Sequence, residues 1–273
     1  MRISISNIAW DIHEDAEVSE ILQSHNVDAI DIAPGKYLKK YPSFSKNKIL
    51  QVRKWWASKG IEIIGMQSLL FGVKDVSLFE NKEFRENMFN VLTQVFIIGQ
   101  LFGARKLVFG SPKNRHKGIL NIKEADTIAR DFFLRLGDQA ALYGVTLCIE
   151  PNPVEYGCDY ITSSRQAIEL VTEIDHPAVK IQLDTGACIL NHESIDDIVS
   201  GLDSYIGHIH ISEPNLVEIG SLKTDHSNIS ELLQKYSCNE PITIEMLTKK
   251  SERLGQINRS ISYVSEVYSR EGS

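Results

Sequence analysis

The sequence predicts a single-domain (β/α)8 barrel, or TIM barrel, over residues 1–273. Apolar segments typical of buried parallel strands alternate with helix-like segments along the whole chain, as in α/β folds. Four of the apolar segments end in polar residues, at intervals of about 30 residues, which is the length of one strand–helix unit. A length of 273 residues suits one barrel domain and leaves little for a second.

Four strand–helix units account for the first half of the chain. We expect strands at residues 3–10, 28–34, 61–70 and 105–112. We expect helices at residues 14–25, 46–58, 82–102 and 123–143. Asp15 suits the N-cap of the first helix because its carboxylate can accept early backbone N–H groups. Gly60, Gly103 and Gly144 follow the other three helices, at the position where glycine commonly ends a helix.

The second half repeats the pattern four more times. We expect strands at residues 146–152, 179–186, 207–214 and 242–246. We expect helices at residues 162–171, 192–202, 229–236 and 252–268, with Thr162 or Ser163 as the cap of the first. A polar loop over residues 216–228 precedes the third of these helices.

Composition narrows the class of protein. With 42% hydrophobic residues a full core can form, and a net charge of −7 argues against a nucleic-acid partner. No signal peptide and no apolar run of the ~20 residues needed for a membrane span is visible. The cysteines show no metal or redox spacing, so we expect a reduced, cytoplasmic setting. The sequence leaves the oligomeric state open, including a homo-oligomer.

Three carboxylates and one imidazole stand at the ends of the last four expected strands: Glu150, Asp184, His210 and Glu245. Side chains at the C-terminal ends of barrel strands converge on the active-site mouth. These carboxylates would repel one another there without a cation. Oxygen-rich sites with one imidazole suit Mn²⁺ or Mg²⁺, so we expect one such divalent ion, with Co²⁺ or Zn²⁺ as possible substitutes.

The strand-end segments resemble the xylose isomerase-like barrels, which include sugar and sugar-phosphate isomerases and epimerases, inosose-converting enzymes and type IV apurinic endonucleases. The resemblance rests on GARKLVFGSP, LCIEPNP, KIQLDTGA, HIHISEP and ITIEM. It implies that Glu150, Asp184, His210 and Glu245 bind the metal, as the matching residues do in ketose 3-epimerases. It implies an isomerase or epimerase of a small carbohydrate, in which Glu150 and Glu245 transfer protons through an enediolate.

Two other functions fit the same residues. One is a metal-dependent dehydratase of a keto-cyclitol or keto-sugar, whose reaction begins with the same proton abstraction. The other is a barrel that binds a sugar without turnover. An apurinic endonuclease is disfavoured, because its three zinc ions need histidines where this sequence has Gln67, Gly110–Ser111 and Ala187, and because the chain is acidic.

Several residues near the strand ends are candidates for contacting the substrate. Gln67 is a candidate to hydrogen-bond a sugar hydroxyl, with filling of the barrel mouth as the alternative. Glu155 matches a substrate-contact glutamate of the family, with a solvated loop charge as the alternative. Trp10 and Phe71 suit either an apolar wall for a sugar or core packing. Lys36 and Lys113 are candidate cations for a phosphate or carboxylate. A loop of neighbouring basic residues accompanies Lys113: Arg115, His116 and Lys117.

Two further expectations concern the seventh strand. Glu213, with Asn215, would orient the ligands from just beyond His210. We expect His208 and His210 to face opposite sides of the strand, so that His210 lies in the site and His208 packs against the helices.

Two positions depart from the ketose 3-epimerases. That family carries a histidine three residues after the strand-6 aspartate, where this chain has Ala187, and an arginine six residues after the strand-7 histidine, where it has Leu216. Both family residues contact the substrate. We therefore expect a substrate other than an unmodified hexulose, with a less polar or bulkier group at that end. Lys36, or the loop from Lys113 to Lys117, would then recognise a phosphorylated or acidic sugar.

Overall fold

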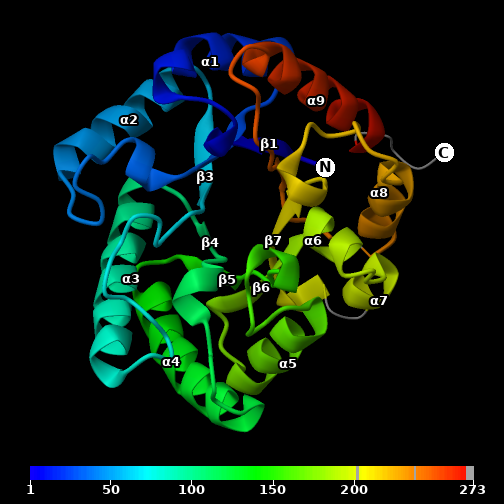
Figure 1. The fold of residues 1–273 in the computed structure, drawn as a ribbon. Helices are drawn as coiled ribbons and strands as arrows, with labels where there is room; N and C mark the ends of the chain where they lie inside the picture. The colour runs from blue at the N-terminus through cyan, green and yellow to red at the C-terminus, as the bar shows by residue number, and fades with distance from the viewer. Residues whose placement is uncertain (201–202, 237, 269–273) are drawn as a thin grey trace.

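Eight parallel strands close into one barrel in chain order, as the sequence predicts (Figure 1). The computed structural model describes residues 1–200, 203–236 and 238–268. Every strand pairs with its sequence neighbours, and β1 pairs with β8 to close the ring. The strands are β1 (Ile3–Ser6), β2 (Ala29–Ile32), β3 (Glu62–Met66), β4 (Lys106–Phe109), β5 (Thr146–Ile149), β6 (Val179–Asp184), β7 (Ile206–Ile211) and β8 (Ile242–Ile244).

The α-helices surround this barrel (Figure 1). In the described part of the chain they are α1 (Asp15–Ser24), α2 (Lys46–Ser58), α3 (Lys82–Phe102), α4 (Ile122–Leu142), α5 (Ser164–Ile174), α6 (Thr185–Leu190), α7 (Ile195–Val199), α8 (His226–Lys235) and α9 (Arg253–Tyr268). The sequence predicted one helix over residues 192–202 after the sixth strand. Within that range the structure has the short helix α7, and residues 201–202 lie outside the described residues. The sequence did not predict α6, which begins directly at the end of β6, where Asp184 caps it.

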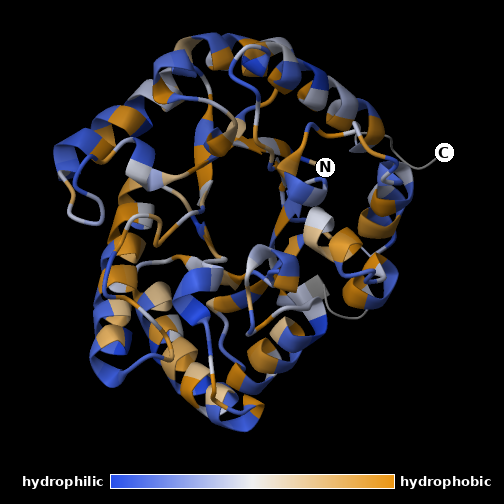
Figure 2. Cartoon of the chain, viewed as in Figure 1, coloured by the Kyte–Doolittle hydropathy of each residue, from blue (hydrophilic) through white to orange (hydrophobic). Residues whose placement is uncertain are grey.

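The main apolar core lies between the strands and the helices. Hydrophobic residues recur on the strands and alternate with hydrophilic ones on the helices (Figure 2). Large aromatic side chains fill this shell, including the fully buried Trp56, Phe96 and Phe132. Burying each such side chain contributes on the order of 1.5–3 kcal/mol.

The inside of the barrel is unusually polar. Asp31, His208 and Thr243 are fully buried and lie together, with His208 Nε2 at 2.6 Å from Asp31 Oδ2 and 3.3 Å from Thr243 Oγ1. Ser4 and Ser6 on β1 and Gln182 on β6 are likewise buried. TIM barrels usually fill this space with branched apolar residues. The polar interior therefore points to chemistry inside the ring.

Of the two helix caps predicted from the sequence, one is confirmed and one is wrong. Ser163 caps α5, because its hydroxyl accepts a hydrogen bond from the Gln166 backbone N–H at 3.3 Å. The Asp15 prediction is wrong: Asp15 is the first residue of α1, and its carboxylate instead accepts hydrogen bonds from Trp10 Nε1 and the Tyr37 hydroxyl. No helix in the described ranges is long and apolar enough to span a membrane.

Candidate functional site

The four predicted ligand residues converge at the C-terminal ends of β5 to β8. One atom from each of Glu150, Asp184, His210 and Glu245 lies within 4.8 Å of the others. His210 Nδ1 faces all three carboxylates, at 3.2 Å from Glu245 Oε2, 3.8 Å from Glu150 Oε1 and 4.0 Å from Asp184 Oδ2. The side chains are at most 14% exposed. This clustering is what the strand-end spacing predicts.

The two glutamates are held in matching ways. Asn152 Nδ2 donates a hydrogen bond to Glu150 Oε2 at 3.0 Å. Gln67 Nε2 donates to Glu245 Oε1. In each glutamate one oxygen is therefore fixed by a neutral amide, while the other faces His210. A carboxylate oriented in this way keeps one oxygen available for a metal or a proton.

Asp184 is fixed by the start of α6 and by β7. Its Oδ1 accepts a hydrogen bond from the Ala187 backbone N–H at 2.7 Å, and the Ser212 hydroxyl lies 2.9 Å from both of its oxygens. Gly186 makes this approach possible, since a Cβ there would lie 2.6 Å from the Ser212 Oγ. The strand end and the helix start thus position this ligand together.

Mutual repulsion perturbs the carboxylates. Burial, reinforced by Glu245 and Glu150, raises the pKa of Asp184 to about 8. Burial and Glu245 also raise the pKa of Glu150. Burial alone would raise the pKa of Glu245, but His210 and Gln67 outweigh it and hold that pKa below its usual value. Burial opposes charge on His210, yet Glu245 and Asp31 raise its pKa well above the ordinary value. A cation would relieve this repulsion.

The donor set fits a hard divalent ion. Both ring nitrogens of the buried His210 lack a hydrogen-bond partner among the described residues. A cation bound among the carboxylates would displace the proton that they favour on this ring, and Nδ1 would then be available as a ligand. Three carboxylates and one imidazole match the preferences of Mn²⁺ and Mg²⁺ better than those of thiol-seeking metals. We conclude that these residues can hold one such ion.

The prediction for His208 is wrong. His208 and His210 both face the barrel interior, with ring centroids 5.2 Å apart, and His208 does not pack against the helices. The physical reason is the strand period: residues two apart lie on the same face. His208 instead hydrogen-bonds Asp31, a residue that the sequence analysis did not identify.

Three of the predicted substrate-contact residues are held by contacts within the protein. Trp10 is 1% exposed and packs edge-on against Trp56. Lys36 Nζ donates to the backbone oxygens of Asn7 and Trp10, and burial lowers its pKa. The Glu213 carboxylate is buried and binds Thr224, His226 and the backbone N–H of Gly220. Their roles toward a substrate remain predictions.

Two other predicted contacts are exposed on loops around the mouth. Glu155 lies in the turn Val154–Tyr156 after β5. Lys113 lines a groove of about 500 Å³ together with the 84% exposed Phe71. The loops that form this groove begin directly after Gln67 and Gly110, and Gly110 approaches Glu150 so closely that a Cβ there would lie 2.3 Å from Oε2. The two loops that line the groove are thus joined in sequence to residues that approach the glutamates.

The neighbours of Lys113 have partners within the protein. Arg115 is fully buried and donates to Asn152 Oδ1 at 3.0 Å. His116 lies 2.9 Å from Asp159, and Lys117 Nζ donates to a backbone oxygen. Arg115 thus orients the Asn152 amide, whose Nδ2 then points at Glu150.

Sequence reasoning missed Asn152, Tyr156 and Ser212. Asn152 follows the β5 glutamate by two residues, and that spacing was the available signal. The Tyr156 hydroxyl accepts from the Asn215 backbone N–H at 3.1 Å and so joins the loops after β5 and β7. Burial raises the pKa of Tyr156, and the negative charges of Asp184, Glu245 and Glu150 raise it further.

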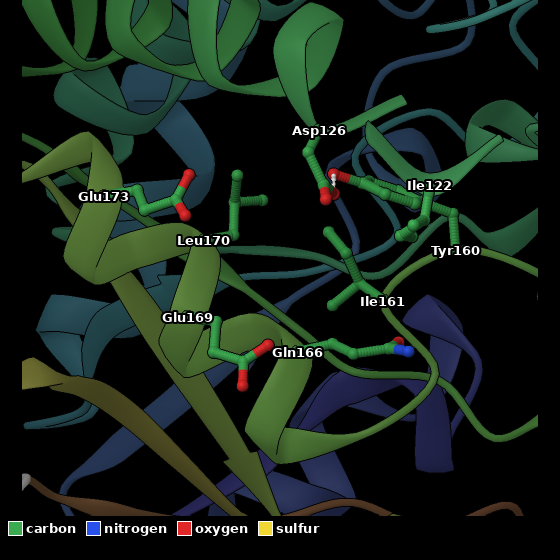
Figure 3. Close-up of a pocket in the computed structure, with 8 residues that line it drawn as sticks. All are labelled: Ile122, Asp126, Tyr160, Ile161, Gln166, Glu169, Leu170 and Glu173. Carbon is green, nitrogen blue, oxygen red and sulfur yellow. Dashed lines mark hydrogen bonds between the residues drawn. The ribbon is translucent and has the colours of Figure 1, made fainter. Parts of the chain in front are cut away.

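A separate depression lies outside the barrel, between α4 and α5 (Figure 3). Its lining includes Asp126, Glu169 and Glu173, and Asp126 accepts a hydrogen bond from Tyr160. None of the four converging ligand residues lines it. It is therefore distinct from the candidate site.

Sequence comparison agrees with the barrel fold. The model of a family described as xylose isomerase-like TIM barrel matches residues 20–266. The chain is also 28% identical over 114 residues to the D-psicose 3-epimerase of Ruminiclostridium cellulolyticum. That alignment spans 41% of this chain and 38% of the relative, so it covers well under two thirds of that protein.

Solved structures share the fold over almost the whole chain. The D-psicose 3-epimerase from Clostridium cellulolyticum H10, solved with D-tagatose, has a TM-score of 0.81 at 16% identity and covers 98% of this chain and 99% of its own. The 3-keto-D-glucoside 4-epimerase from E. coli has a TM-score of 0.78 at 16% identity, with 97% and 99% covered. The family match over most of the chain, on a closed eight-stranded barrel, shows that this protein belongs to the xylose isomerase-like TIM barrel family.

Proposed function

We propose that this protein is a divalent-metal-dependent isomerase or epimerase of a small carbohydrate or sugar derivative. The observation that carries the proposal is the matched pair of glutamates. Glu150 and Glu245 each have one oxygen held by an amide and the other turned toward His210. Two oriented carboxylates at one site can remove a proton and return it, which is the chemistry that such a reaction requires.

The residues divide the work as follows. Glu150, Asp184, His210 and Glu245 would hold the ion, which when bound supplies Lewis acidity to the substrate carbonyl. One glutamate accepts the proton from the carbon next to that carbonyl, and the other glutamate, in its protonated form, donates a proton to the opposite face. The donor ends unprotonated and the acceptor protonated, so protons balance and the carbon is inverted. Gln67 and Asn152 hold the two carboxylates in position.

The relatives support this class of reaction. The D-psicose 3-epimerase matched in sequence and the 3-keto-D-glucoside 4-epimerase matched in fold both act on keto-sugars, according to their names. Ala187 and Leu216 replace the imidazole and guanidinium of the ketose 3-epimerases. Each lost neutral hydrogen bond costs about 0.5–1.5 kcal/mol and a charged one costs more. We therefore propose a sugar derivative in place of free fructose or tagatose. On the loops after β3 and β4, Phe71 and Lys113 would contact a larger or charged group of that derivative.

Solvent deuterium exchange tests the reaction. The metal-free protein is incubated with Mn²⁺ in D₂O and a panel of ketoses, keto-glycosides, inososes and sugar phosphates. We expect deuterium at the carbon next to the carbonyl of at least one substrate and its isomeric product. Glu150→Gln and Glu245→Gln should each abolish product, because an amide cannot accept the proton. Exposed Glu231→Gln on α8 serves as the control.

Other outcomes separate the alternatives. Exchange with loss of water would identify a keto-cyclitol or keto-sugar dehydratase. Tight sugar binding without exchange would identify a binding protein. Efficient epimerisation of unmodified fructose or tagatose would contradict the substrate part of the proposal.

A further inference from the structure

One buried carboxylate lies beneath the four converging ligand residues. Asp31 on β2 is fully buried, and its Oδ2 accepts a hydrogen bond from His208 Nε2 at 2.6 Å. The same oxygen lies 3.7 Å from His210 Nε2. Two imidazoles from β7 therefore face a single carboxylate oxygen.

The two ring nitrogens of His210 face different surroundings. Nδ1 faces Glu245, Glu150 and Asp184, whereas Nε2 faces Asp31. A neutral imidazole has one nitrogen with a lone pair and one with a proton, and a hydrogen bond at one nitrogen decides which is which. A cation bound among the three carboxylates would require the lone pair on Nδ1 and leave the proton on Nε2, where Asp31 Oδ2 lies 3.7 Å away.

We propose that Asp31 is a positioning residue that fixes His210 as a metal ligand through Nδ1, with His208 holding Asp31 in place. The inference rests on the metal site of the proposed function. Metal-binding histidines commonly donate their second N–H group to a carboxylate, which fixes the ring orientation and the tautomer. Asp31 Oδ2 stands where such an acceptor is needed.

The surroundings of Asp31 are built for this carboxylate. Gly65 on β3 makes room for it, because a Cβ there would lie 2.4 Å from Oδ1 and 2.5 Å from Oδ2. No lysine or arginine in the described ranges forms a salt bridge with Asp31, which faces only His208 and His210. The two imidazoles therefore supply the compensating interactions that this buried carboxylate needs.

Metal affinity separates this role from a purely structural one. Calorimetric titration of the metal-free protein with Mn²⁺ should give an affinity about 10- to 100-fold weaker for Asp31→Asn. Asn has the shape of Asp but lacks its charge. If Asp31 only filled space, Asp31→Asn would therefore bind Mn²⁺ as tightly as the wild type. His208→Gln keeps an N–H donor for Asp31, and we expect it to lose less affinity than His208→Leu.

The matched control is His226→Gln. His226 also forms a buried pair with a carboxylate, at 3.2 Å from Glu213. Its other hydrogen bond and its ring contacts in the described ranges are to Tyr268 and Tyr263, not to the proposed ligands. We expect this variant to lose stability while its Mn²⁺ affinity stays at the wild-type value. An equal loss of affinity in His226→Gln and Asp31→Asn would overturn the proposed role of Asp31.

The wild-type protein gives a second readout that does not depend on any variant folding. In Mg²⁺-loaded protein labelled with ¹⁵N-histidine, long-range proton–nitrogen spectra should show the His210 proton on Nε2 and the metal on Nδ1. A metal on Nε2, or Mn²⁺ binding by folded Asp31→Asn as tight as wild type, would overturn the inference. If Asp31→Asn binds weakly but the wild type turns over no sugar, the role of Asp31 stands and the proposed reaction fails.

Discussion

The orientation of the Glu150 carboxylate depends on Asn152. Its Oδ1 accepts from the buried Arg115, and its Nδ2 consequently points at Glu150 Oε2. The amide is thus oriented by one charged group and itself orients another. Arg115 therefore acts on the site through Asn152.

We expect Asn152→Leu to lower kcat about 10- to 100-fold. The change removes a hydrogen bond to a charged group, worth about 1.5–3 kcal/mol, and each 1.4 kcal/mol is tenfold. Because Glu150 would move and the fold would remain, KM should change less than kcat. Steady-state kinetics on the substrate found in the exchange assay measure this, with circular dichroism as a check of folding. A change in KM alone would indicate that Asn152 contacts substrate instead.

The pKa of Asp184 predicts how stability depends on pH without metal. Its pKa is raised from 3.8 to about 8, so the folded protein keeps this proton to a higher pH than the unfolded chain. The stabilising contribution of this group is therefore complete below about pH 4 and is lost as pH rises through about 8. A bound cation takes over the role of the proton.

We therefore expect the rise in Tm caused by Mg²⁺ to grow between about pH 5 and 8. Thermal unfolding of the protein with EDTA and with Mg²⁺ across this range measures it. In Asp184→Asn the dependence should flatten, because the residue no longer titrates. A rise in Tm that is the same at every pH would contradict the assignment.

At the scale of elements, the strand ends position the chemistry. β4 brings Gly110 so close to Glu150 that no side chain fits between them. We expect Gly110→Ala to displace Glu150 Oε2 and lower both kcat and Mn²⁺ affinity by at least tenfold, while the Tm changes little. Gly35→Ala is the control, because a Cβ there meets nothing within 4 Å. Activity retained in Gly110→Ala would show that Glu150 is placed differently.

The sequence was sufficient for the barrel and for the four converging ligand residues. Each strand carries its own apolar signal, and parallel strands bring their C-terminal ends together whatever the details of the loops. Contacts between distant segments were harder to predict. The Glu213–His226 pair and the position of Lys36 over the backbone of Asn7 depend on loop conformation, which no local pattern records. Asp31 was missed because a single aspartate within an apolar strand gives no sign of its partner on β7.

At the scale of the whole molecule, the loops after β3 and β4 together form a groove outside the four converging residues. Phe71 and Lys113 border this groove, whose loops follow Gln67 and Gly110 in sequence. We expect Phe71→Ser and Lys113→Ala to raise KM for the preferred substrate and leave kcat largely unchanged, because these residues lie away from the glutamates. Kinetics with paired substrates, with and without the larger group, would measure this. An equal effect on the free sugar would contradict a role in recognising that group.

The polar interior of the barrel has a consequence for how this scaffold can change. The contacts that keep the ring folded lie mainly in the outer shell, around side chains such as Trp56 and Phe132, where truncation leaves cavities that cost several kcal/mol. The inward alternate positions hold hydrogen-bonded groups such as Asp31, His208 and Thr243. We therefore expect that combinatorial libraries confined to these inward positions contain many folded members, provided that hydrogen-bonded partners are varied together. Such libraries can be screened for new reactions with little loss of stability.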